Sequence, residues 1–219
     1  MHTQTLIDAT DLSAWSNRND SSAFLPQLLR TLILGTVKQV ISISFRAGEG
    51  VAIGGWDGRL DVAIGDAFVP VGGSVWELGT GREVKHKADD DYEKRKLDPL
   101  GCLPSETTYV FVTTRRWGGK DDWIKLRQAE GFWKDVRAYD ADDLATWLES
   151  APHIHIWLSI FLGKHPEAAV DLSHYWSDWS QATDPPLTPE LIVAGRSDVV
   201  DRIHDFLRQP ASSLALQSE

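Results

Sequence analysis

The spacing of hydrophobic residues changes several times along this chain, and that succession restricts its possible folds more than any other feature. Helical spacing from Phe24 to Ile33 gives way to alternation over residues 37–45. Short apolar stretches between glycines follow over 51–64, and a strand-like run over 74–79. A helix returns to one face every third or fourth residue, whereas a strand alternates its faces. The pattern therefore predicts a helix followed by three strands.

The next part of the chain predicts a second helix and a buried strand. Residues 86–98 are highly charged and end before Pro99, which is typical of an exposed helix. The apolar run over 107–114 is typical of a strand buried on both faces of a sheet. Further helices are expected over 121–135, 141–149 and from Pro152, with a short strand over 136–139. The predicted fold class is α/β, with a central mixed sheet flanked by helices.

The sequence changes character after about Gly163. A helix is expected near 174–179, and three prolines within 183–189 indicate a linker. The apolar residues 191–194 predict a strand, followed by a turn at Gly195 and a helix over 197–208. We therefore expect a first domain over 1–165, a helix and Pro-rich linker over 166–190, and the start of a second domain over 191–219, in a chain that continues further.

Composition narrows the class of protein. The 219 residues carry a formal charge of −10 and one cysteine, Cys102, so an intrachain disulfide framework and a cysteine-based zinc site are excluded. Apolar runs are much shorter than the roughly 20 residues of a membrane span, and a cytoplasmic location is expected. Residues 82–137 carry a local net charge of +2 and the remainder −12, so this middle stretch best suits an anionic partner.

Two carboxylates stand out in the strand region. Glu77 lies in the middle of a strand, on the face of Val75 and Gly79, and a buried carboxylate needs a partner because an unpaired charge is costly there. Asp57 lies in a Gly-rich turn at a strand end, where aspartate is also a common turn former. Magnesium is a suitable partner because it prefers one or two carboxylates together with water and phosphate oxygens.

These residues, in this order of elements, resemble the PD-(D/E)XK nuclease superfamily, whose restriction-endonuclease-like core has the order αβββαβ. The resemblance implies an Mg²⁺-dependent endonuclease acting on DNA, with double-stranded DNA favoured, in which Asp57 and Glu77 bind the metal. The superfamily lysine, usually two residues after the glutamate, is replaced here by Gly79. The resemblance therefore implies a lysine displaced to the following helix, with Lys87 as the candidate and Lys85 as the second choice.

A narrower resemblance extends the expectation beyond the first domain. Trp76-Glu77, with the helix from Lys87 to Arg95, is similar to the nuclease-like effector domain at the front of large bacterial antiphage defence NTPases. The segment 192–203 resembles the entry to a STAND-type NTPase domain, although the chain has no phosphate-binding Gly-x-x-x-x-Gly-Lys-Ser/Thr motif. A homo-oligomer is compatible with this expectation.

Two alternatives remain open from the sequence. The absence of lysine at position 79 favours a catalytically inactive nuclease fold used for DNA binding or oligomerisation, and an RNA-directed nuclease with the same metal site is a further hypothesis. Arg115, Arg116 and Trp117 follow a predicted strand. Such residues contact phosphate and stack on a base in nucleic-acid-binding proteins, but an ordinary exposed loop has the same composition.

Overall fold

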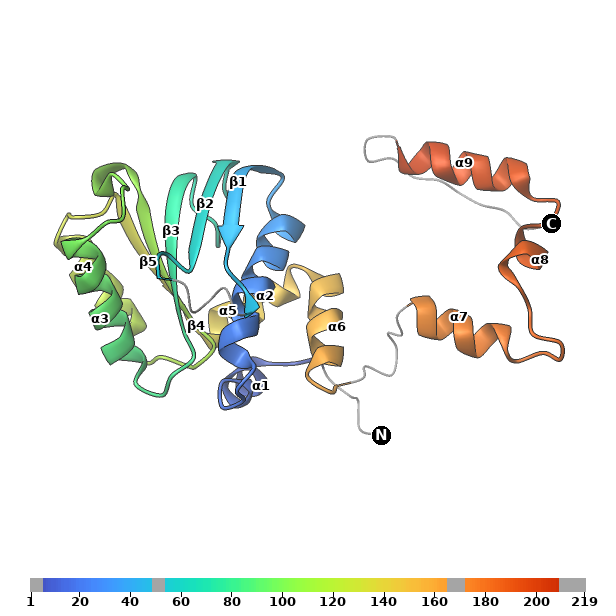
Figure 1. The fold of residues 1–219 in the computed structure, drawn as a ribbon, viewed down its shortest axis with the longest axis horizontal. Coiled ribbons are helices and arrows are strands. Elements are labelled where there is room, and N and C mark those ends of the chain that lie inside the picture. The colour runs from blue at the N-terminus through green and yellow to red at the C-terminus, as the bar shows by residue number, and fades with distance from the viewer. Residues whose placement is uncertain (1–5, 49–53, 165–171, 209–219) are drawn as a thin grey trace. The chain divides into compact units, whose positions relative to one another are not determined.

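A computed structural model describes residues 6–48, 54–164 and 172–208 of the chain, which divides into two compact units over 1–167 and 168–219 (Figure 1). The described elements of the first unit are α1 (Ala9–Trp15), α2 (Ser21–Thr36), β1 (Gln39–Phe45), β2 (Gly58–Ile64), β3 (Gly72–Gly79), α3 (Val84–Leu97), η2 (Pro104–Glu106), β4 (Thr108–Thr113), α4 (Lys120–Ala129), β5 (Asp135–Tyr139), α5 (Ala141–Glu149) and α6 (Pro152–Phe161). The predicted succession of helix, three strands, helix and strand is present as α2 to β4.

The sheet of the first unit is mixed, with the spatial order β1-β2-β3-β4-β5. The first three strands are antiparallel, and β3, β4 and β5 are parallel. Gly58 pairs with Trp76 across β2 and β3, and Gly79 pairs with Thr113 across β3 and β4. The start of β2 therefore lies at the same edge of the sheet as the carboxyl ends of β3 and β4. The predicted α/β class with a mixed sheet flanked by helices is confirmed.

The two faces of the sheet are covered by different helices. One core gathers Trp76, Val110 and Val112 of the sheet with apolar residues of α1, α2, α5 and α6. The other gathers Val75, Tyr109 and Phe111 with apolar residues of α3 and α4. Figure 1 shows α3 and α4 on one side of the sheet and α1, α2, α5 and α6 on the other. Alternate residues of β3 thus enter opposite cores, as strand geometry requires.

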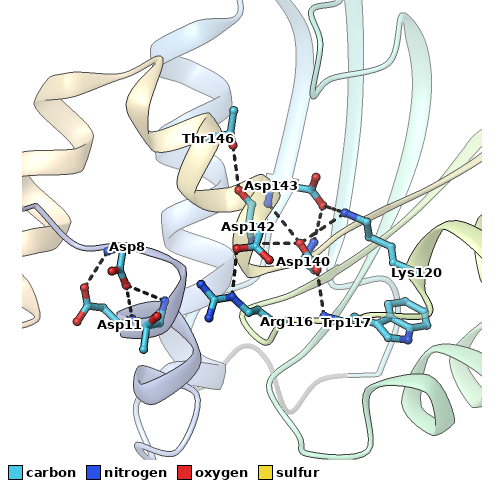
Figure 2. Close-up of polar contacts among 10 residues, drawn as sticks. Asp8, Asp11, Arg116, Trp117, Lys120, Asp140, Asp142, Asp143 and Thr146 are labelled. Atoms are coloured by element: carbon cyan, nitrogen blue, oxygen red, sulfur yellow. Dashed lines mark hydrogen bonds and ion pairs between the residues drawn. The ribbon is translucent and has the colours of Figure 1, made fainter.

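A capping box fixes the start of α5 at the carboxyl end of β5 (Figure 2). The Asp140 side chain accepts hydrogen bonds from the backbone N–H groups of Asp142 and Asp143, and the Asp143 side chain accepts from the Asp140 N–H. Lys120 of α4 forms ion pairs with both Asp140, at 3.5 Å, and Asp143. The Trp117 N–H donates to Asp140 at 3.0 Å. This network ties α5 to the loop that follows β4.

Two predicted elements differ in the structure. The helix expected over 121–135 ends at Ala129, because Gly131 adopts a positive φ of 62°, a conformation that commonly ends helices. Residues 191–194, expected as a strand, belong mostly to a short helix, α8 (Pro189–Val193). The Thr188 side chain accepts a hydrogen bond from the Leu191 N–H at 3.4 Å and so caps this helix. Residues 51–53 of the glycine-rich stretch lie outside the described residues.

The second unit contains α7 (Leu172–Ser180), α8 and α9 (Ser197–Leu207) among its described residues. The rings of Trp176 and Trp179 pack at a centroid distance of 5.6 Å. The Leu187 N–H donates to the Ser180 carbonyl at 2.8 Å and holds the segment between α7 and α8. The predicted start of an NTPase domain in this region stays a prediction. Within the described ranges, no helix has the length and apolar character needed to cross a membrane.

Candidate functional site

Asp57 and Glu77 lie next to each other at the sheet edge where β3 ends. Gly58 faces Trp76 in the antiparallel pair, so Asp57 and Glu77 occupy the following position of the same register. The Asp57 Oδ2 atom accepts a hydrogen bond from the Leu78 N–H at 2.8 Å, which fixes the turn before β2 against β3. The structure thus brings together the two carboxylates that the sequence analysis selected.

Glu77 is buried among apolar groups on the α3 side of the sheet. Only 3% of the residue is exposed, and its neighbours on this face are Val75 and the aromatic rings of β4. Burial raises the pKa of the Glu77 carboxyl to about 8, and the negative charges of Asp57 and Asp91 add to this effect, while the Arg95 hydrogen bond opposes it. The fold therefore disfavours the ionised form of Glu77.

Arg95 of α3 connects three parts of this site. Its Nε atom donates to Glu77 Oε1, and its Nη2 atom donates to the Gly55 carbonyl. The guanidinium carbon lies 4.6 Å from the ring centroid of Trp56, a cation–π contact. Arg95 is itself buried, with 5% exposure. One side chain therefore holds the segment before Asp57, strand β3 and helix α3 together.

Lys87 and Asp91 form a second charged pair on α3. The Lys87 Nζ atom lies 2.7 Å from Asp91 Oδ1. Asp91 is buried, and its Oδ2 atom has no hydrogen-bond partner among the residues that the structure describes. Burial raises the pKa of Asp91, an effect that the hydrogen bond and charge of Lys87 oppose. Asp91 is therefore a third carboxylate beside Asp57 and Glu77, with one oxygen left unsatisfied.

The stem of Lys87 lies against Gly79, two residues after Glu77. A Cβ atom added at Gly79 would lie 3.2 Å from Lys87 Cγ and 3.2 Å from Phe111 Cζ. Gly79 therefore provides the room in which Lys87 reaches from α3 to the end of β3. Lys85, the second candidate, lies in solvent with 71% of its side chain exposed and pairs with Asp89 at 2.6 Å.

The donor set at this edge suits a hard cation better than a soft one. In addition to burial, the charge of Asp57 raises the pKa of both Glu77 and Asp91, so the three carboxylates lie close together, and oxygen atoms are the ligands that Mg²⁺ prefers. The Asp91 Oδ2 atom, which has no hydrogen-bond partner among the described residues, is a carboxylate oxygen of the type that such an ion binds. No set of three or more His, Cys, Asp or Glu side chains converges as a preformed metal cluster within residues 6–48, 54–164 and 172–208.

The sequence analysis did not select Asp91 or Arg95 as site residues. Its suggestion that Trp117 stacks on a base is contradicted by the structure. Asp91 and Arg95 follow Lys87 at intervals of four residues, which places them on one helix face. Trp117 is only 9% exposed and its ring packs against Phe111 and Trp123, so it does not face a base.

Comparison of the chain with family models, curated proteins and solved structures finds no match.

Proposed function

We propose that the first unit is an Mg²⁺-dependent endonuclease domain that hydrolyses phosphodiester bonds of DNA, with duplex DNA as the favoured substrate. The placement of the Lys87 stem against Gly79 carries this proposal. The Lys87 ammonium pairs with Asp91 at 2.7 Å, and the charge of Asp91 in turn acts on the pKa of Glu77, so this lysine belongs to the carboxylate cluster although the strand itself has no lysine. In its order of elements, the core from α2 to β4 agrees with a restriction-endonuclease-like fold.

Each charged residue has a role in this proposal. Asp57 and Glu77 would hold the metal, with Asp91 as a further oxygen donor. A bound Mg²⁺ supplies Lewis-acid polarisation of the phosphodiester and lowers the pKa of a water molecule. The Lys87 ammonium places positive charge where negative charge develops during hydrolysis. Arg95 holds the Glu77 carboxylate and the segment before Asp57 in fixed positions.

We also propose that this domain is the effector of a larger bacterial antiphage defence protein, with the second unit leading into an NTPase region. This part of the proposal rests on the similarity of Trp76-Glu77 and of the helix from Lys87 to Arg95, and on segment 192–203. The expected cellular location is the cytoplasm. The purified full-length protein would then couple a nucleotide-controlled step to DNA cleavage.

A second candidate function is a catalytically inactive nuclease fold that binds DNA or mediates oligomerisation. The Arg95–Glu77 ion pair favours it, because the guanidinium already neutralises the carboxylate that would bind the metal. The two functions differ in one measurement: an active domain cuts DNA with Mg²⁺ and not with EDTA, and an inactive one binds DNA and leaves it intact.

The decisive experiment measures cleavage of duplex DNA by four proteins: wild type, Glu77→Ala, Lys87→Ala and Lys85→Ala. Glu77→Ala should abolish cleavage, and Mg²⁺ should raise the Tm of the wild type but not of this variant. Lys87→Ala should slow cleavage by about two orders of magnitude, the usual effect of removing one preorganised charged group. Lys85→Ala is the matched control and should cut near the wild-type rate. Cleavage at the wild-type rate by Glu77→Ala would refute the site.

A further inference from the structure

Two arginines stand together at the sheet edge that carries the candidate site. Arg115 comes two residues after β4, and Arg82 lies in the connection from β3 to α3. Because β3 and β4 are parallel and Gly79 pairs with Thr113, both segments leave the sheet at the same edge. Asp57, Gly79 and Thr80 line a small cavity of about 50 Å³ at this edge. The two arginines thus belong to segments that begin beside the proposed metal ligands.

Arg115 is held in position by groups that do not neutralise its charge. Its Nε atom donates to the Thr80 carbonyl at 2.8 Å, and its Nη2 atom donates to Asn17 Oδ1 at 3.0 Å. An arginine has five N–H donors in a rigid fork, so these two bonds fix the plane of the guanidinium and leave the others free to bind. Within the described ranges, the Nη1 atom of Arg115 makes no hydrogen bond.

Arg82 adds a second cation, one that has no carboxylate partner among the described residues. It is exposed and makes neither a hydrogen bond nor an ion pair with any residue that the structure describes. The pKa of Arg115 is lowered, first by partial burial and then by the positive charge of Arg82, so the two charges are close enough to repel. Neighbouring Arg116, in contrast, pairs with Asp142 at 3.1 Å (Figure 2). Two adjacent unneutralised guanidinium groups favour an anion between them.

We propose that Arg82 and Arg115 bind backbone phosphates of duplex DNA next to the bond that the Asp57–Glu77 site cuts. This inference rests on the proposed function and names the residues that position its substrate. Guanidinium groups match the geometry of phosphate oxygens and bind them through two parallel hydrogen bonds. The Asn17 contact fixes Arg115 to the segment between α1 and α2, so the phosphate site is built on three segments that the sheet edge brings together.

The test measures the affinity of the full chain for a fluorescent duplex by anisotropy at several salt concentrations. EDTA is present so that no DNA is cut. The slope of log affinity against log salt counts the phosphates that the protein neutralises, at about 0.9 for each. Arg82→Ala should make this slope shallower by about one, and Arg82→Ala with Arg115→Lys should weaken binding further. Arg82 is exposed and makes no hydrogen bond or ion pair with the described residues, so its replacement should leave folding intact and this variant remains informative if Arg115 is needed for stability.

Lys38→Ala is the matched control for the removal of one positive charge. Lys38 is exposed and precedes Gln39, which pairs with Ile64 at the other end of β2 from Gly58. Its salt slope should equal that of the wild type. An Arg82→Ala slope equal to the wild type, or a wild-type protein that does not bind the duplex, would overturn the inference. Cleavage in Mg²⁺ is measured separately: a cutting protein with an unchanged slope refutes only the phosphate site, and a shallower slope without cutting refutes only the nuclease.

Discussion

Glu77 should make the stability of the protein depend on pH in a way that Glu77→Gln removes. The pKa of its carboxyl is about 8 in the folded chain, against an ordinary value of 4.5. Between about pH 4.5 and pH 8, the Glu77 carboxyl therefore keeps a proton in the folded state that it has released in the unfolded state. The contribution of Glu77 to stability is complete below about pH 4.5 and is lost as the pH rises to 8. Each pH unit corresponds to about 1.4 kcal/mol, so the full loss is about 5 kcal/mol.

The assay is urea unfolding of wild type and Glu77→Gln in EDTA, at pH values from 5 to 8. The glutamine does not titrate, so the free energy of unfolding of the wild type minus that of the variant should fall by about 1.4 kcal/mol per pH unit. Adding Mg²⁺ should reduce this fall in the wild type, because a metal binds the ionised carboxylate. A difference that stays constant from pH 5 to 8 would show that Arg95 keeps Glu77 ionised throughout and would refute the reasoning.

Three further substitutions test the surroundings of the site. At pH 9, above the pKa of Glu77, Arg95→Met should lower the free energy of unfolding by about 3–5 kcal/mol, because it leaves a buried carboxylate unpaired; a loss below about 1 kcal/mol in urea unfolding at this pH would contradict the buried ion pair. Gly79→Ala should cost about 1–3 kcal/mol through overpacking, whereas Gly81→Ala, with nothing within 4 Å of the added Cβ, should leave the Tm unchanged. Equal Tm values for the two glycine variants would argue against the close contacts at Gly79. Lys120→Met should destabilise the protein at pH 7, and the loss should shrink as the pH falls and the partners Asp140 and Asp143 gain protons. Burial opposes the lowering of the Asp140 pKa, but the Trp117 N–H and the Lys120 charge outweigh it. A loss of stability independent of pH would exclude this electrostatic origin.

The sequence predicted the strands and the face of Glu77 because both depend on local alternation. Val75, Glu77 and Gly79 share one face of β3 in the structure, as the period of two requires. The strand predicted over 191–194 was wrong because a short apolar run does not distinguish a strand from a helix. Thr188 and Pro189 gave the missed signal, since both are favoured at a helix start.

Local sequence patterns could not predict which residues pair with Glu77. The acidic residues from Asp89 to Asp91 follow the start of α3, where negative charge is ordinarily favoured by the helix dipole alone. The structure separates them: Asp89 bonds to Trp123 and Arg127 on the α4 side, and Asp91 turns to Lys87. The pairing of Arg95 with Glu77 joins residues 18 positions apart and depends on how α3 packs against β3.

Helix α3 is attached to the sheet partly by charges, and this affects how it can detach. Its buried residues are Val84, Ala88, Asp91, Tyr92 and Arg95, so two of the five are ionisable groups of the site. Ionising Glu77 at high pH, or removing its partner Arg95, costs folding free energy at the contacts that seat the helix. Local opening of α3, measured by amide hydrogen exchange, should therefore respond to pH and to Mg²⁺ in step with the site. Protonation of the carboxylates and local opening of helix α3 are therefore coupled equilibria.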